Sequence, residues 1–208
     1  MAMKALRNTY WLVRHGESVP NVQNLIVSSM EEGVKAEYGL TPKGRLQAQK
    51  AGQELHNILA SFAHSKVRIV SSPFSRARET AELVAANLGF ENNNGRFQIS
   101  EMLMERFFGA DNELQGHEAY GGVWERDMRD ITDGGPAGGE SVQDVSARVT
   151  TLMEMLEREH EGCAVVLVAH GDTLSILQAV VNGSELGRHT QYGMKNCEIR
   201  RLGGEAHE

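Results

Sequence analysis

The chain has 208 residues, of which 40% are hydrophobic and 24% charged, a composition that excludes a disordered chain and fits one globular domain over residues 1–208. Its formal charge of −7 argues against binding a nucleic acid or an anionic membrane. The two cysteines, Cys163 and Cys197, form no CxxC pair and predict neither a disulfide framework nor a metal site. We expect a cytoplasmic protein, because no apolar run has the length of a membrane span or of a signal-peptide core.

Three β-rich runs are predicted to form strands, and each leads directly into a polar loop. They are residues 9–15, 66–72 and 163–170, with weaker strand signals at 96–100 and 197–202. The third run is apolar without alternation, which is typical of a central strand covered on both faces.

Segments of helical period separate these strands. Helices are predicted to begin after Thr41 and Ser141 and to occupy residues 75–88 and 173–181. Thr41 is an N-cap followed by proline, and Ser141 with Asp144 has the form of a capping box. Strands that alternate with helices predict an α/β fold, a three-layer sandwich with a mostly parallel central sheet and helices on both faces.

Residues 105–139 show neither the helical nor the strand period, and they contain the glycine-rich run 134–139. Long segments of this kind inside a domain are usually functional. We therefore interpret this segment as an irregular excursion from the sheet, which forms a lid or a substrate-specificity insertion.

The three strongest strands each end in a polar cluster. The carboxyl ends of parallel strands share one edge of a sheet, where ligands bind, so these clusters are expected to converge. Arg14 and Arg76 supply paired planar donors suited to a tetrahedral oxyanion, which predicts a phosphate group as the ligand. A histidine at each of two strand ends, His15 and His170, adds a candidate nucleophile and favours phosphoryl transfer over storage.

Five stretches of the chain resemble motifs of the histidine phosphatase superfamily, in its phosphoglycerate mutase-like branch. They occur in the family's order and span roughly residues 8–181. The stretches are Arg14-His15-Gly16-Glu17-Ser18, the segment 71–81 with Arg76 and Thr80, Met104-Glu105-Arg106-Phe107-Phe108-Gly109, Gly138-Gly139-Glu140-Ser141, and Val168-Ala169-His170-Gly171-Asp172-Thr173.

The resemblance implies roles for individual residues. His15 matches the nucleophile that becomes a phosphohistidine, and the residues that match those holding the phosphate oxygens are Arg14, Arg76 and His170. Glu105 matches the acid that protonates the departing alkoxide and later activates water. Substrate contacts are expected from Ser18, Asn21 and Arg106, and from Gly171, where glycine allows close backbone approach.

Chemical reasoning on the same residues agrees with these roles. A nucleophilic imidazole needs one bare nitrogen, so the other must be held as N–H, and the turn at Gly16 can bring a backbone carbonyl to His15. Loose in-line transfer needs mainly positive charge around three equatorial oxygens, which two guanidiniums and a second imidazole supply without a metal or a cofactor. Glu105 can donate a proton if burial raises its pKa.

Three functions remain open within this resemblance, and the first is preferred. It is a metal-independent phosphomonoesterase that acts through a phosphohistidine on a small phosphorylated metabolite. The alternatives are a bisphosphoglycerate-dependent phosphoglycerate mutase, which the Glu-Arg-aromatic-aromatic-Gly stretch supports, and a phosphate-binding regulatory module without turnover. A mutase needs extra cations around its doubly phosphorylated acid, whereas residues 105–140 carry three basic side chains against nine acidic ones. The three are Arg106, Arg126 and Arg129, and the nine are Glu105, Asp111, Glu113, Glu118, Glu125, Asp127, Asp130, Asp133 and Glu140.

Overall fold

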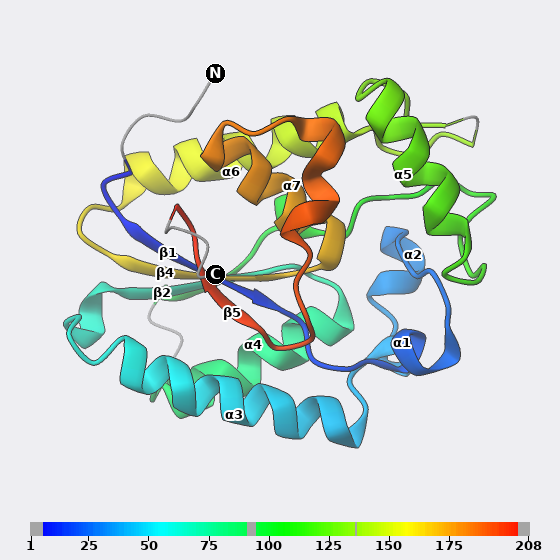
Figure 1. The fold of residues 1–208 in the computed structure, drawn as a ribbon. Helices are drawn as coiled ribbons and strands as arrows, with labels where there is room; N and C mark the ends of the chain where they lie inside the picture. The colour runs from blue at the N-terminus through cyan, green and yellow to red at the C-terminus, as the bar shows by residue number, and fades with distance from the viewer. Residues whose placement is uncertain (1–5, 91–94, 136, 204–208) are drawn as a thin grey trace.

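A five-stranded sheet with the order β3-β2-β4-β1-β5 forms the centre of the molecule (Figure 1). The structure is a computed structural model that describes residues 6–90, 95–135 and 137–203. Neighbouring strands run parallel except β5, which pairs antiparallel with β1. The strands are β1 (Thr9–Arg14), β2 (Val67–Ser71), β3 (Phe97–Ile99), β4 (Ala164–Ala169) and β5 (Ile199–Arg201).

Long helices cover both faces of this sheet, which confirms the predicted α/β sandwich (Figure 1). One face packs against α3 (Pro42–Ile58) and α4 (Ser75–Asn87), and the other packs against α6 (Val142–Glu159) and α7 (Gly171–Asn182). All six residues of β4 are buried, as the unbroken apolar run 163–170 predicts for a central strand.

Side chains alternate between the two cores along β1. Tyr10 and Leu12 join the core under α6 and α7, whereas Val13 joins the core under α3 and α4. This period of two follows from the pleat of a strand. The alternation fixes which way β1 faces, and therefore where the residues after Arg14 emerge from the sheet.

Two of the helices begin at the caps that the sequence predicts. The hydroxyl of Thr41 accepts a hydrogen bond from Gly44 N at 3.0 Å, at the start of α3. At the start of α6, the Asp144 N–H donates to the Ser141 hydroxyl at 3.1 Å, and the Ser141 N–H donates to the Asp144 carboxylate at 2.9 Å. Such caps satisfy backbone donors that have no partner inside the helix.

The segment 105–139 is not irregular throughout, because it contains the eleven-residue helix α5 (Ala119–Arg129). The sequence pattern did not predict this helix for two reasons. Its buried positions, one turn apart, are Val123 and the charged residue Asp127, and a Gly-Gly pair interrupts its first turns. Further short elements are α1 (Val19–Gln23), α2 (Met30–Gly33) and the 3₁₀ turns at Ala36–Tyr38, His64–Lys66, Glu101–Leu103 and Leu186–Tyr192.

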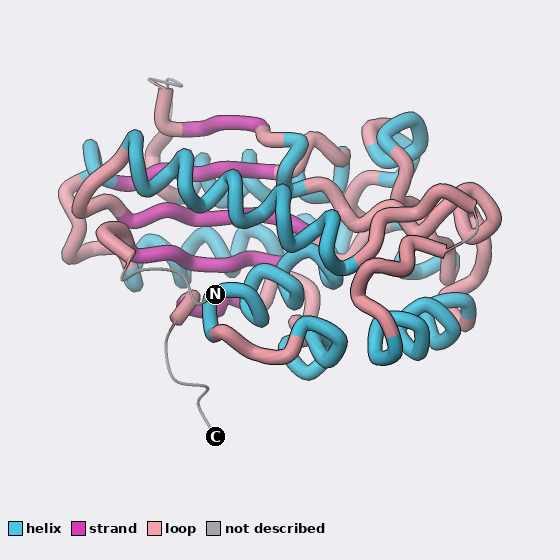
Figure 2. The backbone as a smooth tube through the Cα atoms, turned by 90° about the horizontal axis from the view of Figure 1, so that it is seen from above, coloured by secondary structure: helices cyan, strands magenta, loops and turns pink. Residues whose placement is uncertain are grey.

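The helices α1, α2 and α5 lie beyond the carboxyl ends of the parallel strands in both Figure 1 and Figure 2. They therefore surround the sheet edge at which the three polar clusters were predicted to meet. In the part of the chain that the structure describes, no helix has the length and apolar character needed to cross a bilayer.

Candidate active site

The carboxyl ends of β1, β4 and β2 lie side by side, and this brings the three polar clusters together. Arg14 on β1 is in register with Ala169 on β4, and the His15 N–H donates to the Ala169 carbonyl at 3.0 Å. On the other side of β4, the Ser72 N–H donates to the Val168 carbonyl, also at 3.0 Å. As a result, the imidazole rings of His15 and His170 have centroids only 5.2 Å apart.

The imidazole of His15 is buried and held in one tautomer. Its Nδ1 lies 2.8 Å from the carbonyl oxygen of Gly16, the contact predicted for the turn that follows β1. A carbonyl only accepts, so Nδ1 carries the proton and Nε2 is bare. Nε2 accepts from Arg76 Nε at 3.2 Å. Burial, and then the charges of Arg76 and Arg14, hold the pKa of His15 well below its usual range, so the ring is neutral at neutral pH.

The turn after His15 requires glycine at two places where backbones meet. A Cβ on Gly16 would lie 2.6 Å from the carbonyl oxygen of Gly44, and a Cβ on Gly44 would collide with the carbonyl oxygen of Glu17. The Gly16 N–H donates to the hydroxyl of Thr80 at 3.0 Å. Thr80 is thus a supporting residue within the segment 71–81, and it fixes the carbonyl that orients His15.

Two guanidiniums next to His15 keep donors that no described residue uses. Arg76 is 4% exposed, and its Nη2 donates to the Val27 carbonyl at 2.9 Å. Arg14 Nη1 donates to the Met194 carbonyl at 2.6 Å. Among the residues that the structure describes, Arg76 Nη1 and Arg14 Nε have no hydrogen-bond partner. Burial lowers the pKa of Arg76 to about 10, but at neutral pH the group is still a cation. Buried cations with free donors are suited to an anion.

The second imidazole, His170, is fully buried beside His15. Its Nε2 lies 2.8 Å from the hydroxyl of Ser72, which itself accepts from the Phe74 N–H at 3.2 Å. Its Nδ1 has no partner in the described part of the chain. Burial, followed by the charges of Arg76, His15 and Arg14, lowers the pKa of His170 well below its usual range. The role of Ser72 was not predicted, although it belongs to the polar cluster after β2.

A carboxyl group, that of Glu105, faces this cluster from the start of the segment 105–139. Its Oε1 accepts from the N–H groups of Arg106 at 3.0 Å and Thr173 at 3.2 Å. A Cβ on Gly171 would lie 3.8 Å from both Glu105 Oε2 and Arg14 Cζ, so the carboxyl and the guanidinium flank the same glycine. Burial, and then the charge of Asp172, raises the pKa of Glu105. A carboxyl in such surroundings holds a proton more readily than an exposed one, which suits a proton donor.

Comparison with known proteins identifies the family. Residues 10–208 match the family model of the histidine phosphatase superfamily, branch 1. The chain belongs to this superfamily. A curated relative from Salmonella choleraesuis, named "Probable phosphoglycerate mutase GpmB", is 27% identical over 197 residues, which are 92% of this chain and 83% of the relative.

Solved structures of similar proteins include phosphatases. A mycobacterial glucosyl-3-phosphoglycerate phosphatase, solved in complex with VO3, is 27% identical with a TM-score of 0.74, over 95% of this chain and 92% of that protein. A protein described as mycobacterial hydrolase 1 is also 27% identical, with a TM-score of 0.73, over 93% of this chain and 87% of that protein. These similarities confirm the family and the fold, and both kinds of enzyme, phosphatase and mutase, appear among the relatives.

Two of the residues expected to contact substrate, Ser18 and Asn21, support the backbone of this superfamily member beside His15. The N–H and the hydroxyl of Ser18 both lie within 3.1 Å of Asn21 Oδ1, and Ser18 is fully buried. Asn196 Nδ2 donates to Asn21 Oδ1 at 3.2 Å and to the His15 carbonyl at 3.0 Å. Asn196 lies outside every motif that the sequence analysis quoted, so only the tertiary structure reveals it.

The structure places Arg106 away from the phosphate-binding donors. Its Nη1 and Nη2 donate to the Asp127 carboxylate at 2.6 and 2.8 Å, its Nε donates to the Glu140 carbonyl at 2.8 Å, and the side chain is 1% exposed. The guanidinium is thus occupied by α5 and by the end of the lid segment. Each nitrogen of this buried guanidinium has a partner, so we assign Arg106 a structural contact here, and its contact with substrate remains a prediction.

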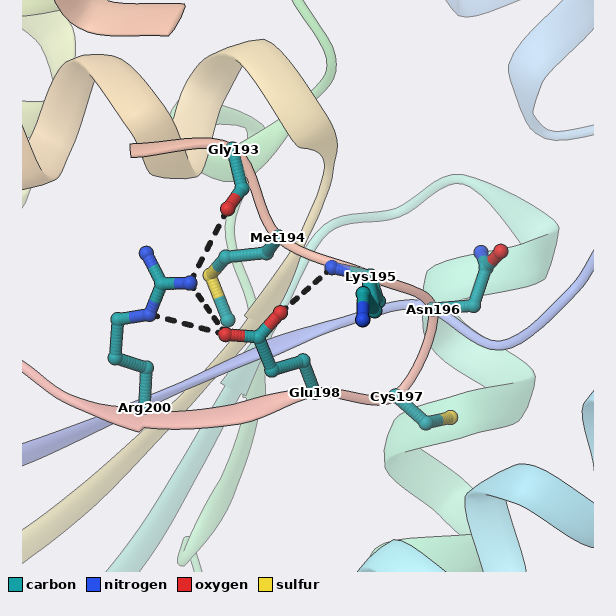
Figure 3. A pocket seen from close by; sticks show the side chains of 7 residues that line it. All are labelled: Gly193, Met194, Lys195, Asn196, Cys197, Glu198 and Arg200. Carbon is teal, nitrogen blue, oxygen red and sulfur yellow. Dashed lines mark hydrogen bonds and ion pairs between the residues drawn. The ribbon is translucent and has the colours of Figure 1, made fainter. Parts of the chain in front are cut away.

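The loop Gly193–Glu198 forms one wall of the site and carries a broad depression of about 790 Å³ on its outer side (Figure 3). The Cys197 N–H donates to the Arg14 carbonyl at 2.9 Å, which ties this loop to the end of β1. Arg200, the principal cation lining the depression, bonds Glu198 and the Gly193 carbonyl (Figure 3). His15, Arg76 and His170 do not line it, so we place the chemistry at the strand ends rather than here.

Proposed function

We propose that this member of the histidine phosphatase superfamily is a phosphomonoesterase that acts through a phosphohistidine at His15. The observation that carries the proposal is the tautomer and the hydrogen bonding of the His15 imidazole. Its Nδ1 is held by the Gly16 carbonyl, while its Nε2 is bare, faces Arg76 and lies beside His170. A neutral imidazole with one bare nitrogen among cationic donors is arranged to attack a phosphoryl group.

In the first step, Nε2 of His15 forms a bond to phosphorus as the bond between phosphorus and the leaving oxygen breaks. Arg14 and Arg76 balance the charge on the equatorial oxygens. Ser72 donates to Nε2 of His170, which leaves the Nδ1–H of His170 for a phosphoryl oxygen. The departing alkoxide takes the proton of Glu105, because an alkoxide is a poor leaving group without one.

In the second step, the ionised Glu105 takes a proton from water, and the water oxygen attacks phosphorus. The P–N bond breaks, inorganic phosphate leaves, and His15 and the proton on Glu105 are both restored. The raised pKa of Glu105 suits these alternating roles, since the carboxyl must hold a proton in one step and accept one in the next. The scheme uses only side chains of this protein and requires neither a metal nor a cofactor.

Phosphoglycerate mutase is the second candidate, and the charge around Glu105 disfavours it. Of the three basic residues within 105–140, Arg106 is neutralised by Asp127, and Arg129 is paired with Glu125 at 3.7 Å on the exposed face of α5. Arg126 is the one of the three with no ion pair among the described residues. A doubly phosphorylated intermediate would need further cations there. The name of the curated relative, and the Glu-Arg-aromatic-aromatic-Gly stretch of this chain, which resembles the mutase form, keep this candidate open to experiment.

The test is phosphate release from p-nitrophenyl phosphate between pH 5 and 8 in the presence of a chelator. We expect multiple turnovers, and acid-labile phosphate bound to the wild-type protein after rapid quenching, with none on His15→Ala. Absence of release at every pH would contradict the proposal and favour a phosphate-binding module. Interconversion of 2- and 3-phosphoglycerate that depends on added bisphosphoglycerate, and that outpaces hydrolysis, would identify a mutase instead.

A further inference from the structure

An aromatic wall, defined here as Phe108, Tyr120 and Trp124, stands beside the candidate proton donor. The Tyr120 ring stacks on Trp124 with centroids 5.3 Å apart and an interplanar angle of 11°, and it meets Phe108 edge-on at 4.9 Å. Phe108 follows Glu105 by three positions. Trp124 Nε1 donates to both carboxylate oxygens of Asp172 at 3.2 Å, in the first turn of α7. The wall is therefore anchored to the two segments that supply Glu105 and His170.

The Tyr120 ring lies close to the charged groups of the site, because Trp124, on which it stacks, is hydrogen-bonded to Asp172 in the first turn of α7. Apart from burial, the strongest influences on the pKa of Tyr120 are the charges of Glu105 and Asp172, which raise it, and of Arg76 and Arg14, which lower it. The phenol in turn affects the pKa of Arg76. Because charges act strongly only over short distances in a protein, the phenol lies among the charged groups of the site. Of these charges, that of Glu105 has the largest influence on the pKa of Tyr120.

This hydroxyl is free to bind a substrate. The Tyr120 side chain is partly exposed, and among the residues that the structure describes its hydroxyl has no hydrogen-bond partner. The raised pKa keeps the phenol protonated, so it is a donor throughout the physiological range. Three rings hold it in place, since Tyr120 also packs against His117 at 5.3 Å. A rigid, unused donor at the edge of a site is the kind of group that orients a ligand.

Most basic side chains near Glu105 and the aromatic wall are already paired with a carboxylate in the described part of the chain. Arg106 is saturated by Asp127, and Arg148 is bound to the Glu140 carboxylate at 2.8 and 3.0 Å. The Asp172 carboxylate lies there as well, bonded to Trp124. Among the described residues, Arg14, Arg76 and Arg126 have buried guanidinium nitrogens without a partner. The phosphoryl group needs the first two, and Arg126 lies against Gly135 in the glycine-rich turn, 3.1 Å from where a Cβ there would be. A carboxylate on the leaving group would therefore meet like charge without a partner.

A hollow of about 210 Å³ adjoins Glu105 and has room for a small organic group. Its wall combines thioether, aromatic and hydroxyl side chains with one further carboxylate, that of Glu140, which Arg148 already neutralises. The residues that line it with Glu105 and Glu140 are Ser28, Ser29, Met30, Met104 and Phe107. Such a surface accepts an uncharged group that has both apolar and oxygen-bearing parts.

We propose that Tyr120 binds the leaving group by donating its hydroxyl to a leaving-group oxygen, and that the preferred substrates are phosphate monoesters of uncharged, hydroxylated alcohols rather than of hydroxy acids. This inference rests on the proposed phosphatase function. It names the substrate class of the same site and adds one specificity-determining residue, on α5, to the groups at the strand ends.

The test compares two substrates that share a three-carbon skeleton, glycerol 3-phosphate and 3-phosphoglycerate, with phenyl phosphate as a third substrate whose leaving group carries no further oxygen. For wild-type protein we expect kcat/KM to be at least about tenfold higher for glycerol 3-phosphate than for 3-phosphoglycerate, because of like-charge repulsion. Tyr120→Phe keeps the ring and removes only the hydroxyl. We expect it to lower kcat/KM for glycerol 3-phosphate about five- to tenfold, mostly through KM, and to affect phenyl phosphate at least fivefold less.

A matched control is Tyr192→Phe. The Tyr192 hydroxyl bonds Ser184, just past the carboxyl end of α7 and therefore away from the site, and this variant should match wild type on all three substrates. Equal losses of Tyr120→Phe on glycerol 3-phosphate and phenyl phosphate would overturn the role of Tyr120. If wild-type protein preferred 3-phosphoglycerate, the proposed substrate class would be overturned. If Lys195→Ala then lost that preference, the exposed cation of Lys195 on the loop Gly193–Glu198 would be its cause.

Hydrolysis of phenyl phosphate separates the phosphatase function from the substrate class. If phenyl phosphate is hydrolysed by wild type and not by His15→Ala, the phosphatase function stands whichever three-carbon substrate is preferred. If phenyl phosphate is not hydrolysed at all, the phosphatase function is wrong and the substrate class built on it is wrong with it.

Discussion

Two buried guanidiniums, Arg76 in the phosphate-binding cluster and Arg106 beneath α5, have opposite surroundings. Each nitrogen of the Arg106 guanidinium bonds either the Asp127 carboxylate or the Glu140 carbonyl. In addition, Arg106 Nη1 lies 3.6 Å from Asp172 Oδ2. Arg76 forms no ion pair in the described part of the chain and keeps an unused Nη1. A buried cation whose partners are all internal holds elements together. A buried cation with unused donors is retained at a cost in stability, and binding of an anion gives it a function.

The same contrast separates two buried histidines. His15 offers a bare nitrogen to the site, whereas His189 bonds Ser175 at 2.8 Å through Nδ1 and Asp127 at 3.3 Å through Nε2. No motif in the sequence includes His189. It is a member of the polar cluster around Arg106, which joins α5 to α7 and to the 3₁₀ turn Leu186–Tyr192.

Replacing each of these histidines gives the largest expected difference between the two regions. His15→Ala should lower kcat on p-nitrophenyl phosphate on the order of 10⁴-fold or more, because it removes the nucleophile, and should leave thermal unfolding nearly unchanged. His189→Ala should do the reverse, with kcat near that of wild type and a stability loss of about 1–3 kcal/mol from the partners left in the core. Turnover by His15→Ala at a substantial fraction of the wild-type rate would show that His15 is not the nucleophile.

Removing the partner of Arg106 tests the structural side of the comparison. Asp127→Ala leaves a cation buried without its carboxylate, and we expect a loss of about 3–5 kcal/mol in the free energy of unfolding, measured with urea at pH 7. Asp111→Ala, at an exposed position of the same lid segment, is the control and should change stability by less than about 0.5 kcal/mol. A loss below about 1 kcal/mol for Asp127→Ala would mean that the pair does not hold α5 in place.

The role of Glu105 can be tested through the leaving group. Glu105→Gln should lower kcat/KM for glycerol 3-phosphate by about 10²-fold, and for p-nitrophenyl phosphate only a few fold, since a nitrophenolate departs without a proton. Because the first step needs the protonated carboxyl, the wild-type rate on the alkyl phosphate should fall as pH rises through the raised pKa of Glu105. Equal losses on both substrates would exclude Glu105 as the proton donor.

The smallest expected effect is on stability. A carboxyl whose folded pKa is raised contributes stability below its unfolded pKa, near 4.5, and this contribution is lost as pH rises through the folded value. The amide of Glu105→Gln does not titrate, so this variant does not lose stability as pH rises in this way. Its Tm should therefore match wild type near pH 4 and exceed it by about 1–3 °C at pH 8, in calorimetric scans at both pH values. A variant that is less stable than wild type at pH 8 would show that the carboxylate is stabilised where it lies.

Much of the fold and part of the site could be predicted from local pattern. The apolar run 163–170 identified β4 because a strand buried on both faces has no polar positions. The carbonyl of Gly16 as partner of His15 followed from the need for a bare nitrogen in a tight turn. Helix α5 did not follow, because its buried face includes Asp127, and a charged residue reads as exposed until its partner is known.

The sequence by itself determined which residues end the parallel strands, and hence that two histidines and two arginines meet at one edge of the sheet. Local periodicity and the topology of parallel strands suffice for that. Only the tertiary structure decided that Arg76 keeps an unused donor while each nitrogen of Arg106 has a partner, and that Tyr120 stacks on Trp124 beside Asp172. The physical reason is that the state of a buried polar group depends on the partners that reach it. Asp127 and Asp172 come to Arg106 from helices 21 and 66 positions away, a distance that no local pattern records.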